Sequence, residues 1–565
     1  MDAAEALAVD VGAAPGGAPV VSDPVVSEPI SPVEPSVPAG TLPRDPETPW
    51  VAPSWFVGLL IIGAVVTVCA GIVLRFWTRS DMWLDEALTF DIARLPLSHL
   101  QGALKRDGAP PLYYVLLHFW IRVFGPSNLE VRSLSGVLSC ATLPFVWIAG
   151  RRIGGRTVAA GAVVLVASSP FAVRYATENR MYALVAFLTA AGLVAMQRAL
   201  EKPTVGNLVG VGLAASLLLY SQYWALYLVG VTGLWLAWQW WRGDGSRRRN
   251  ARATLGAVIV GCATFIPWVP TFLYQSKHTG TPWAVPADFA ALVNAVTSFA
   301  GGATNQGRAL ALLYFALAGL GLFGIAGGIR HIVLDLRTRP EGRGLAIVTV
   351  GTLAVAVVGG YASRSAFQAR YASVIFVLLA LLVAMGFATF TDQRIRAGVM
   401  AATVVFGIAG SVPNIWTSRT QAGQVATALA KLGRPGDVVA FCPDQLGPSV
   451  YHVLPPSRYS EITFPRETGP QFVNWVDYAD ATAAGNPVQF ASRLESMATS
   501  AHSIWYVWAP GYETYHTKCE DIENDLLADH TLVGRTIFPF TQVMNSSTLY
   551  EDMELVQFTH VPAAG

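Results

Sequence analysis

The chain has 565 residues, of which 53% are hydrophobic and 13% charged, and its mean hydropathy is +0.44. Soluble chains carry about 25% charged residues, so this composition indicates a polytopic membrane protein and excludes an ordinary soluble domain. The formal net charge of +1 gives no argument for binding nucleic acid.

The first 52 residues differ from the rest of the chain. They are rich in Pro, Ala, Val and Glu and show neither helical nor strand periodicity, which predicts a disordered tail. The tail lacks the basic start and the early apolar core of a signal peptide, so we expect the first apolar run to be retained in the protein.

Long apolar runs follow the tail. A helix needs about 20 apolar residues to cross a bilayer. By that criterion residues 53–412 form a polytopic α-helical membrane domain, for which the sequence predicts about eleven spans. The predicted spans are 54–77, 131–149, 157–173, 181–199, 205–221, 224–241, 254–274, 308–329, 344–362, 371–390 and 397–412.

One apolar run, "PPLYYVLLHFWIRVFG" (110–125), is excluded from these spans. As a helix it would reach only about 24 Å, less than the ~30 Å hydrocarbon core. It also carries His118 and Arg122, and an arginine at mid-bilayer is costly. We therefore expect an amphipathic helix that lies in the membrane interface.

Basic loops predict the orientation of the spans. The positive-inside rule places the Arg-containing loops and the N-terminal tail in the cytoplasm. These loops are 150–156, 198–203, 242–252, 330–343 and 392–396. Arg75 and Arg79 at the other end of the first span oppose this orientation, but the later loops outnumber them. The extracytoplasmic face then carries the first loop (78–130), the segments 174–180, 275–307 and 363–370, and everything after residue 412.

Residues 413–565 lose the apolar runs. A helical pattern at 419–432 alternates with β-rich runs at 437–442, 503–509 and 553–560, which predicts a small extracytoplasmic α/β domain. That location would permit a disulfide between Cys442 and Cys519, although two unpaired buried thiols would give the same sequence. The sequon "NSS" (545–547) is too short a pattern to carry a role.

Two adjacent carboxylates, Asp85 and Glu86, stand in the first loop, within "SDMWLDEALTFDIARL". Neighbouring residues of a helix point about 100° apart, so the two carboxylates should have different roles. In the structural alternative, Asp85 caps the helix and Glu86 complements the helix dipole. The two interpretations are compatible, because a capping Asp can still face a cavity.

Further polar side chains lie at the ends of later spans on the same predicted face. They are Lys105, Arg106 and Asp107 in the first loop, Arg132 in "NLEVRSLSG", Glu178, Arg180 and Tyr182 in "ATENRMYAL", and Arg370 and Tyr371 in "QARYASVIF". Each has a structural alternative: a solvated loop charge, a turn residue, a snorkelling arginine or a Glu–Arg pair that ties two spans together. Several ionisable groups at one membrane edge nevertheless indicate function.

The residue types on this face suit a lipid-linked phosphosugar. A carboxylate can act as a general base, and arginines can bind a phosphate through two hydrogen bonds. Apolar walls between spans can hold a polyprenyl tail. No spacing of Cys, His or carboxylates indicates a metal site, and no cofactor is required, although a divalent metal could assist.

Five segments, in this order, resemble the GT-C glycosyltransferases of the protein O-mannosyltransferase and lipid A aminoarabinose transferase type: "WLDEALT", "RDGAPPLYYVLLHFWIRVFG", "NLEVRSLSG", "SPFAVRYATENRMYAL" and "QARYASVIF". The resemblance covers about residues 54–412 and implies a polyprenyl-phosphate sugar donor. It maps the catalytic Asp onto Asp85, with Glu86 beside it. Many relatives read Asp-x-His-Pro-Pro where this chain reads "DGAPP", so Ala109 replaces the His.

The resemblance and the residues together predict an inverting transfer of a sugar, mannose-like, to an acceptor hydroxyl on the extracytoplasmic side of the plasma (inner) membrane. Asp85 would accept the proton, Glu86 would orient the acceptor or tune Asp85, and arginines would stabilise the leaving phosphate. The acceptor could be a lipid, a glycan or a protein. One alternative is a transporter or flippase of a lipid-linked substrate, which predicts internal repeats and helices broken near the midplane. Another is a scaffold that binds partners through residues 413–565.

Overall fold

The computed structural model describes residues 52–280, 290–326, 331–337, 339–363, 368–512, 514–540 and 550–561. The expected disordered tail (1–52) lies outside these residues apart from its last position, and the sequon (545–547) lies outside them as well.

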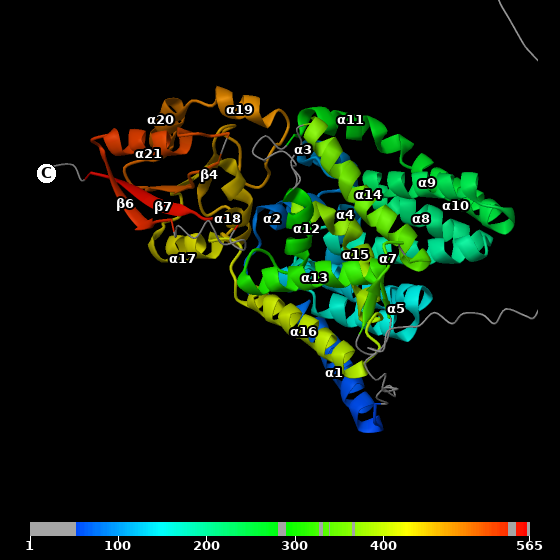
Figure 1. The fold of residues 1–565 in the computed structure, drawn as a ribbon. Coiled ribbons are helices and arrows are strands. Elements are labelled where there is room, and N and C mark those ends of the chain that lie inside the picture. The colour runs from blue at the N-terminus through cyan, green and yellow to red at the C-terminus, as the bar shows by residue number, and fades with distance from the viewer. Residues whose placement is uncertain are drawn as a thin grey trace, which may run out of the picture. The chain divides into compact units, whose positions relative to one another are not determined.

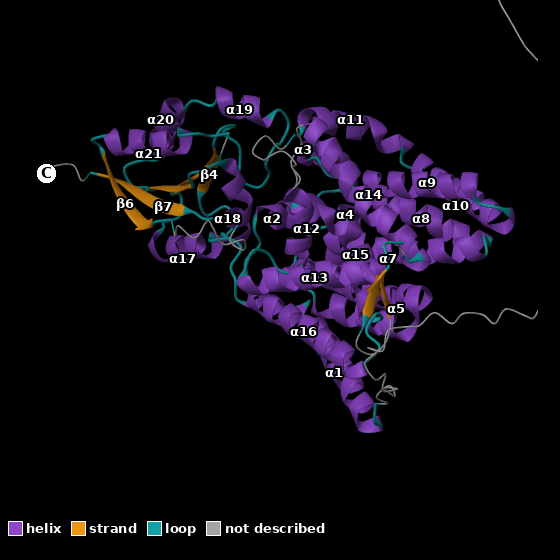
Figure 2. Cartoon of the chain, viewed as in Figure 1, coloured by secondary structure: helices purple, strands orange, loops and turns teal. Residues whose placement is uncertain are grey.

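The first part of the described chain is a bundle of helices (Figures 1 and 2). Its helices are α1 (Ser54–Leu74), α2 (Leu84–Arg94), α3 (Leu97–Asp107), α4 (Leu112–Phe124), α5 (Asn128–Ser168), α6 (Pro170–Ala176), α7 (Tyr182–Glu201), α8 (Val205–Leu219), α9 (Ala225–Arg242), α10 (Gly245–Ala263), α11 (Val269–His278), α12 (Ala290–Phe299), α13 (Asn305–Phe323), α14 (Pro340–Ser363), α15 (Ser373–Phe387) and α16 (Gln393–Ser411). Within the described residues, eight helical segments are long and apolar enough to cross a membrane. The polytopic helical class is confirmed, and the number of spans stays a prediction.

The long helix α5 contains two of the predicted spans. Its backbone leaves helical geometry at Gly155, where φ is 73°, a value that glycine adopts without strain. Gly150 and Ala159 then lie so close that a Cβ atom at residue 150 would be 2.8 Å from the Cα of Ala159. The chain therefore reverses within "GRRIGGR", and the predicted spans 131–149 and 157–173 are the two arms of a helical hairpin.

Two of the predicted segments differ in detail. The span predicted to continue to residue 329 ends at Phe323, because the chain turns into a short antiparallel hairpin of β1 (Gly324–Ala326) and β2 (Ile332–Leu334). The run 110–125 forms the short helix α4, about 20 Å long at 1.5 Å per residue. Its His118 is buried, with Nδ1 2.7 Å from the carbonyl oxygen of Ala93 in α2. The placement of α4 in a membrane interface stays a prediction.

Arg75, at the end of α1, is fully buried. Its guanidinium group donates to Ser139 Oγ (2.9 Å) and to the carbonyl oxygens of Gly71, Val166 and Ala167 (2.7–2.8 Å). The last two carbonyls belong to the C-terminal end of α5, which carries the negative end of the helix dipole. Arg75 is thus a packing residue and not a loop charge, whereas Arg79 is exposed. The orientation of the spans stays a prediction.

The second part of the described chain contains a five-stranded sheet with the strand order β4-β3-β5-β7-β6. The strands are β3 (Val438–Cys442), β4 (Ser460–Thr463), β5 (Ile504–Trp508), β6 (Leu532–Phe538) and β7 (Glu554–His560). Strand β3 pairs in parallel with β4 and β5, whereas β7 is antiparallel to β5 and β6. The three predicted strands are the three central ones. Strands β3 and β5 read as apolar runs because both of their faces are buried, whereas β7 is only partly buried. The edge strands β4 and β6 gave no such signal.

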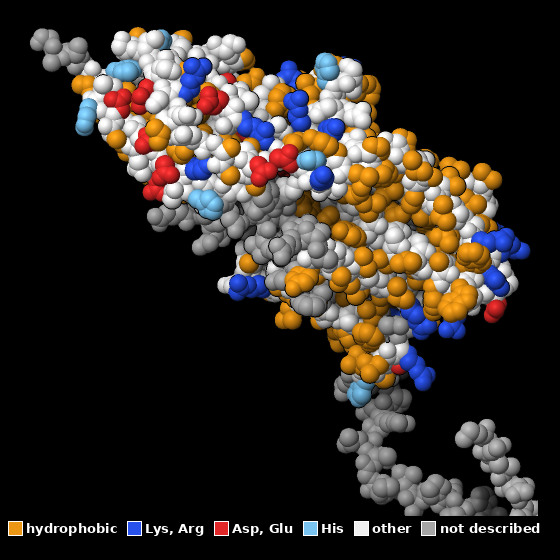
Figure 3. All heavy atoms as spheres, turned by 90° about the horizontal axis from the view of Figure 1, so that it is seen from above, with side chains coloured by type: hydrophobic (Ala, Val, Ile, Leu, Met, Phe, Trp, Pro, Cys, Tyr) orange, Lys and Arg blue, Asp and Glu red, His pale blue; other side chains and the backbone are white. Residues whose placement is uncertain are grey.

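Helices cover both faces of this sheet (Figure 1). Val439 and Phe441 pack on α17 (Ala422–Leu432) and α18 (Gly447–Val453). Val438 and Ala440, on the opposite face, pack on α20 (Pro487–Met497) and α21 (Lys518–Ala528). Tyr478 of α19 (Tyr478–Ala484) belongs to the same hydrophobic cluster. The α/β class of the C-terminal region is confirmed. In Figure 3 hydrophobic side chains dominate the helical part, while most of the acidic side chains in view lie on this second part.

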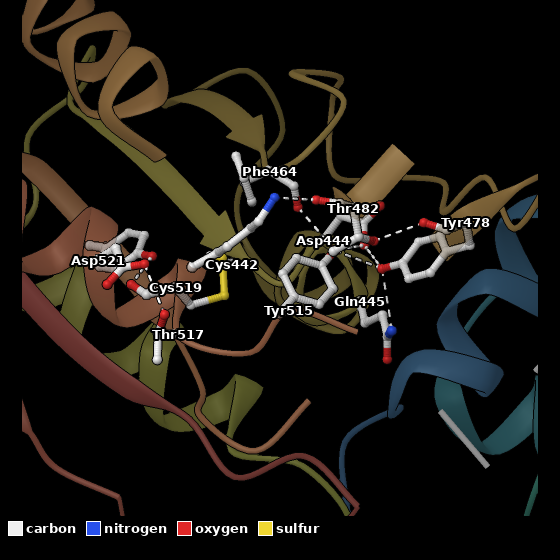
Figure 4. The surroundings of a disulfide bond; sticks show 12 residues. Cys442, Asp444, Gln445, Phe464, Tyr478, Thr482, Tyr515, Thr517, Cys519 and Asp521 are labelled. Carbon is white, nitrogen blue, oxygen red and sulfur yellow. Dashed lines mark hydrogen bonds between the residues drawn. A yellow bond between two sulfur atoms is a disulfide. The ribbon is translucent and has the colours of Figure 1, made fainter. Parts of the chain in front are cut away.

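A disulfide joins Cys442, at the end of β3, to Cys519 in α21 (Figure 4). This decides between the two alternatives that the sequence left open. Beside it, the buried carboxylate of Asp444 accepts hydrogen bonds from the hydroxyl groups of Tyr478 and Tyr515. Burial raises the pKa of Asp444 to about 6, although the two hydroxyl groups oppose the shift. These contacts hold the loops at one end of the sheet together.

Candidate active site

Asp85 and Glu86 lie in the first turn of α2. The residue that caps this helix is Trp83, which makes no side-chain capping bond, so the expectation that Asp85 caps the helix is wrong. Both carboxylates instead lie near the positive end of the helix dipole. Their side chains then diverge: that of Asp85 is 19% exposed, and that of Glu86 is fully buried.

The Asp85 carboxylate faces two arginines from distant parts of the chain. Arg180 precedes α7, and its Nε lies 3.8 Å from Oδ2 of Asp85. Arg370 lies in the turn before α15, and its Nη2 is 3.7 Å from the same oxygen. These distances are too long for direct hydrogen bonds, so the carboxylate attracts each arginine without saturating the donors of either one. Among the described residues, the buried Nε atoms of both arginines find no hydrogen-bond partner.

Arg180 is oriented by a short chain of polar groups. Its Nη1 donates to Thr89 Oγ1 (2.8 Å) and to the hydroxyl oxygen of Tyr114 (3.3 Å). The Tyr114 hydroxyl donates to Asp107 Oδ2 at 2.6 Å. Burial raises the pKa of Asp107, although Arg180 opposes the shift. The predicted residue Asp107 is therefore linked to Asp85 through Tyr114 and Arg180.

Aromatic rings line the other arginine. The Arg370 guanidinium lies over the rings of Trp83 (5.3 Å) and Tyr371 (5.9 Å). Within the part of the chain that the structure describes, the hydroxyl group of the buried Tyr182 has no hydrogen-bond partner. We refer to Asp85, Arg180 and Arg370 as the Asp85 cluster, and Tyr182 and Tyr371 stand around it.

Glu86 has a different environment. Arg132 binds it through two hydrogen bonds of 2.7 Å, from Nε to Oε1 and from Nη2 to Oε2. Arg419 Nη1 donates to Oε2 at 3.2 Å, and the backbone N–H of Asn179 donates to Oε1 at 3.3 Å. Burial disfavours the charged form, but the two arginines outweigh it and lower the pKa of Glu86 to about 2.

We refer to Glu86, Arg132 and Arg419 as the Glu86 cluster. All of its members are buried, and Arg132 also donates to the carbonyl oxygens of Ser80 and Asp81. The position of Glu86 does not allow the predicted contact with an acceptor, since both of its oxygens are held by arginines inside the protein. Arg132 is likewise committed to Glu86 and to the backbone, so the arrangement disfavours its predicted role at the donor phosphate.

Three other predicted residues lie away from Asp85. Glu178 pairs with Arg174 one helical turn earlier (2.6 Å), so the pair that was expected to tie two spans together is local. The side chains of Lys105 and Arg106 are exposed, and Lys105 lies over the ring of Tyr274 at 4.0 Å. They behave as the loop charges of the structural alternative.

Sequence reasoning missed several members of the site. Thr89 and Tyr114 carry no charge and resemble ordinary helix residues, and Arg419 lies beyond the last predicted span.

A cavity of about 160 Å³ opens beside Arg419, between α6, the end of α16 and Tyr550. Arg174 and Tyr175 line it as well. Among the described residues, no three His, Cys, Asp or Glu side chains come together as a metal site.

Residues 108–270 match the sequence profile of the family described as dolichyl-phosphate-mannose-protein mannosyltransferase. The match covers less than half of the chain and begins after Asp85. No curated protein matches the chain.

In fold, the chain is similar to ArnT from Cupriavidus metallidurans. ArnT bound to undecaprenyl phosphate is 13% identical, with a TM-score of 0.53 over 90% of this chain and 98% of that chain. ArnT in the apo state is 12% identical, with a TM-score of 0.53 over 89% and 98%. The oligosaccharyltransferase of Archaeoglobus fulgidus is more distant, at 13% identity and a TM-score of 0.48 over 79% of this chain and 67% of that chain. The likeness to ArnT confirms, at the level of the fold, the resemblance that the motifs predicted.

Proposed function

We propose that the protein is a membrane glycosyltransferase that transfers a sugar from a polyprenyl-phosphate donor to an acceptor hydroxyl. One observation carries this proposal: the partly exposed carboxylate of Asp85 faces Arg180 and Arg370, and both arginines keep unused donors. A base beside two phosphate-binding groups suits the transfer of a sugar from a phosphate. The fold supports it, since ArnT, which shares the fold, has been observed with bound undecaprenyl phosphate.

The reaction assigns a role to each side of the cluster. The acceptor oxygen attacks the anomeric carbon of the sugar, and the bond from that carbon to the phosphate oxygen breaks. Asp85 takes the acceptor's proton as the new bond forms, a contribution of about 10²–10⁴-fold in rate. The electron pair leaves with the polyprenyl phosphate, whose growing negative charge Arg180 and Arg370 stabilise through their free N–H groups. Attack from the face opposite the phosphate inverts the anomeric centre.

The structure also offers room for the lipid and for the acceptor. The helices that follow Arg180 and Arg370, α7 and α15, are apolar, but α15 is almost entirely buried. Of the two, only α7, which is partly exposed, offers an apolar surface along which a prenyl tail can lie. The cavity beside Arg419 is a candidate place for the acceptor. Mannose is the first sugar to test, because the matched family is described by dolichyl-phosphate-mannose.

The proposal places this end of the bundle outside the cytoplasm, in the plasma (inner) membrane, with residues 1–52 as a cytoplasmic tail and 413–565 as an extracytoplasmic domain. Two observations support that orientation. The Arg-containing loops obey the positive-inside rule when the Asp85 loop is outside. The disulfide of Cys442 and Cys519 suits an oxidising compartment.

The test is to incubate the purified protein with a panel of radiolabelled polyprenyl-phosphate sugars and a membrane extract as the source of acceptor. We expect wild type to transfer one of the sugars and Asp85→Asn to transfer none above background. Asp480→Asn, an exposed carboxylate in α19, is the matched control and should behave as wild type. Transfer at the wild-type rate by a folded Asp85→Asn variant would refute the role of Asp85.

The transporter alternative is not favoured. The Asp85 cluster is built from residues at the ends of apolar helices, whereas transporters bind their substrates near the membrane midplane at broken helices. A counterflow assay in liposomes would reveal transport, and we expect none.

A further inference from the structure

The C-terminal region contacts α2 on both sides of Asp85. Trp83 and Leu84, the two residues before Asp85, pack in the hydrophobic core under the sheet, which otherwise consists of residues between 438 and 558. The ring of Trp83 lies 4.5 Å from that of Tyr550. The first turn of the helix is therefore anchored in the C-terminal region and not in the helical bundle alone.

Polar contacts complete this anchor. The backbone N–H of Leu84 donates to Oε1 of Glu551 at 2.8 Å, and Glu551 is buried. On the other side of Asp85, Arg419 donates to Glu86. Residues 419 and 551 act as one unit, because the backbone N–H groups of Tyr550 and Glu551 donate to the carbonyl oxygen of Arg419 (2.9 and 3.2 Å).

Arg419 itself is held in one geometry. Besides Glu86, its guanidinium donates to the carbonyl oxygen (2.8 Å) and to Oγ1 (2.6 Å) of Thr177 and to Asn414 Oδ1 (3.2 Å). Thr177 lies three residues before Arg180. One buried side chain thus links α2 to the segment that brings Arg180 to Asp85.

We infer that Arg419 is a positioning residue for Asp85, through which the C-terminal region sets the distance between Asp85 and Arg180. This inference rests on the proposed function. Among the described residues, the guanidinium of Arg419 bonds to Glu86, Thr177 and Asn414 and not to Asp85. It acts through Glu86 and Thr177, and a displacement of about 1 Å in such a site can cost about 10²-fold in rate.

The closing experiment compares Arg419→Met, Arg419→Lys and the control Arg535→Met, which removes an exposed arginine of β6. We expect Arg419→Met to lower kcat about 10²-fold with little change in the donor KM, because the donor-binding groups remain. Arg419→Lys keeps the charge opposite Glu86 but cannot bind both Thr177 atoms, so it should recover part of kcat. Arg535→Met should match wild type.

A second measurement does not depend on activity. Hydrogen exchange of the α2 backbone should be faster in Arg419→Met than in wild type, with unchanged exchange in α21, and Arg419→Lys should lie between. Unchanged kcat and unchanged α2 exchange in Arg419→Met would overturn the inference, as would an α2 that exchanges faster only together with α21. If wild type transfers no sugar, the proposed function fails, whereas the exchange measurement still decides whether Arg419 positions α2.

Discussion

Asp85 and Glu86 are neighbours in one helical turn, yet they have opposite surroundings. The Asp85 cluster has N···O distances of 3.7–3.8 Å, a partly exposed carboxylate and unused donors. The Glu86 cluster has distances of 2.7–3.2 Å and a fully buried carboxylate. A fully bonded, buried ion pair holds structure, whereas a loosely paired, accessible one can still bind a ligand. This difference supports the proposal that Asp85 takes part in the chemistry and that Glu86 has a positioning role.

The largest expected effect is on the transfer rate of the Asp85→Asn variant, whose stability should change little. Asp85→Asn should lower the rate of transfer about 10²–10⁴-fold, because the base is lost. Its thermal unfolding should stay close to that of wild type, since a partly exposed ion pair contributes only about 0–1 kcal/mol. Activity assays and thermal unfolding in detergent check both parts. A large loss of stability would place Asp85 in the structural class with Glu86.

Glu86→Gln should show the reverse balance. It leaves Arg132 and Arg419 buried without a counter-charge, which typically costs about 3–5 kcal/mol. We expect a clearly lower unfolding temperature, and a loss of activity that follows the loss of folded protein and of α2 order. A Glu86→Gln protein as stable as wild type but inactive would show that Glu86 takes part in the chemistry.

The arginines of the Asp85 cluster should affect the donor more than the fold. Arg180→Gln and Arg370→Gln each remove a charged hydrogen-bond donor worth about 1.5–3 kcal/mol, or roughly 10–100-fold in donor KM. Lysine at either position should restore part of the affinity, because it keeps the charge without the planar fork. Titration with the donor measures KM. An unchanged donor KM in both glutamine variants would remove the phosphate from this cluster.

The smallest expected effect is on the pH dependence of the protein's stability. The pKa of Glu86 is lowered to about 2 against its ordinary 4.5, so its contribution to stability is present above pH 4.5 and is lost as the pH falls towards 2. Burial raises the pKa of Glu551 to about 8, so the folded state holds that proton more tightly than the unfolded chain does. Its contribution is complete below pH 4.5 and is lost as the pH rises towards 8.

Two variants separate the opposite effects of Glu86 and Glu551 on the pH dependence of stability. Glu551→Gln should flatten the stability profile between pH 5 and 8, and Glu86→Gln should flatten it on the acid side. Thermal unfolding across the pH range measures both. Identical pH profiles for wild type and Glu551→Gln would show that Glu551 is already ionised in the folded protein.

Much of the fold was readable from the sequence because apolar runs and turn residues act locally. The reversal within "GRRIGGR" and the central strands β3, β5 and β7 correspond to predicted segments. The edge strands escaped detection because they are short or partly exposed. The candidate site was readable in part, since Asp85, Arg180 and Arg370 are charged residues at span ends.

The remaining members of the site could not be predicted from the sequence. Arg419 stands more than 300 residues from Glu86 in the chain, with its Nη1 donating to the Glu86 carboxylate. Nothing in the residues around Arg419 indicates that partner. Likewise, the sequence separated Asp85 from Glu86 only by the 100° between neighbouring helical residues and by the family resemblance, and neither indicated that Glu86 is buried.

By itself the sequence determined the membrane class, the helical segments and the C-terminal α/β region, since these follow from composition and periodicity along the chain. Only the tertiary structure decided which carboxylate is buried and which arginines face it. The physical reason is that burial and ion pairing are set by the neighbours that packing brings from distant segments. Here one of those neighbours, Arg419, comes from the region beyond the last apolar helix.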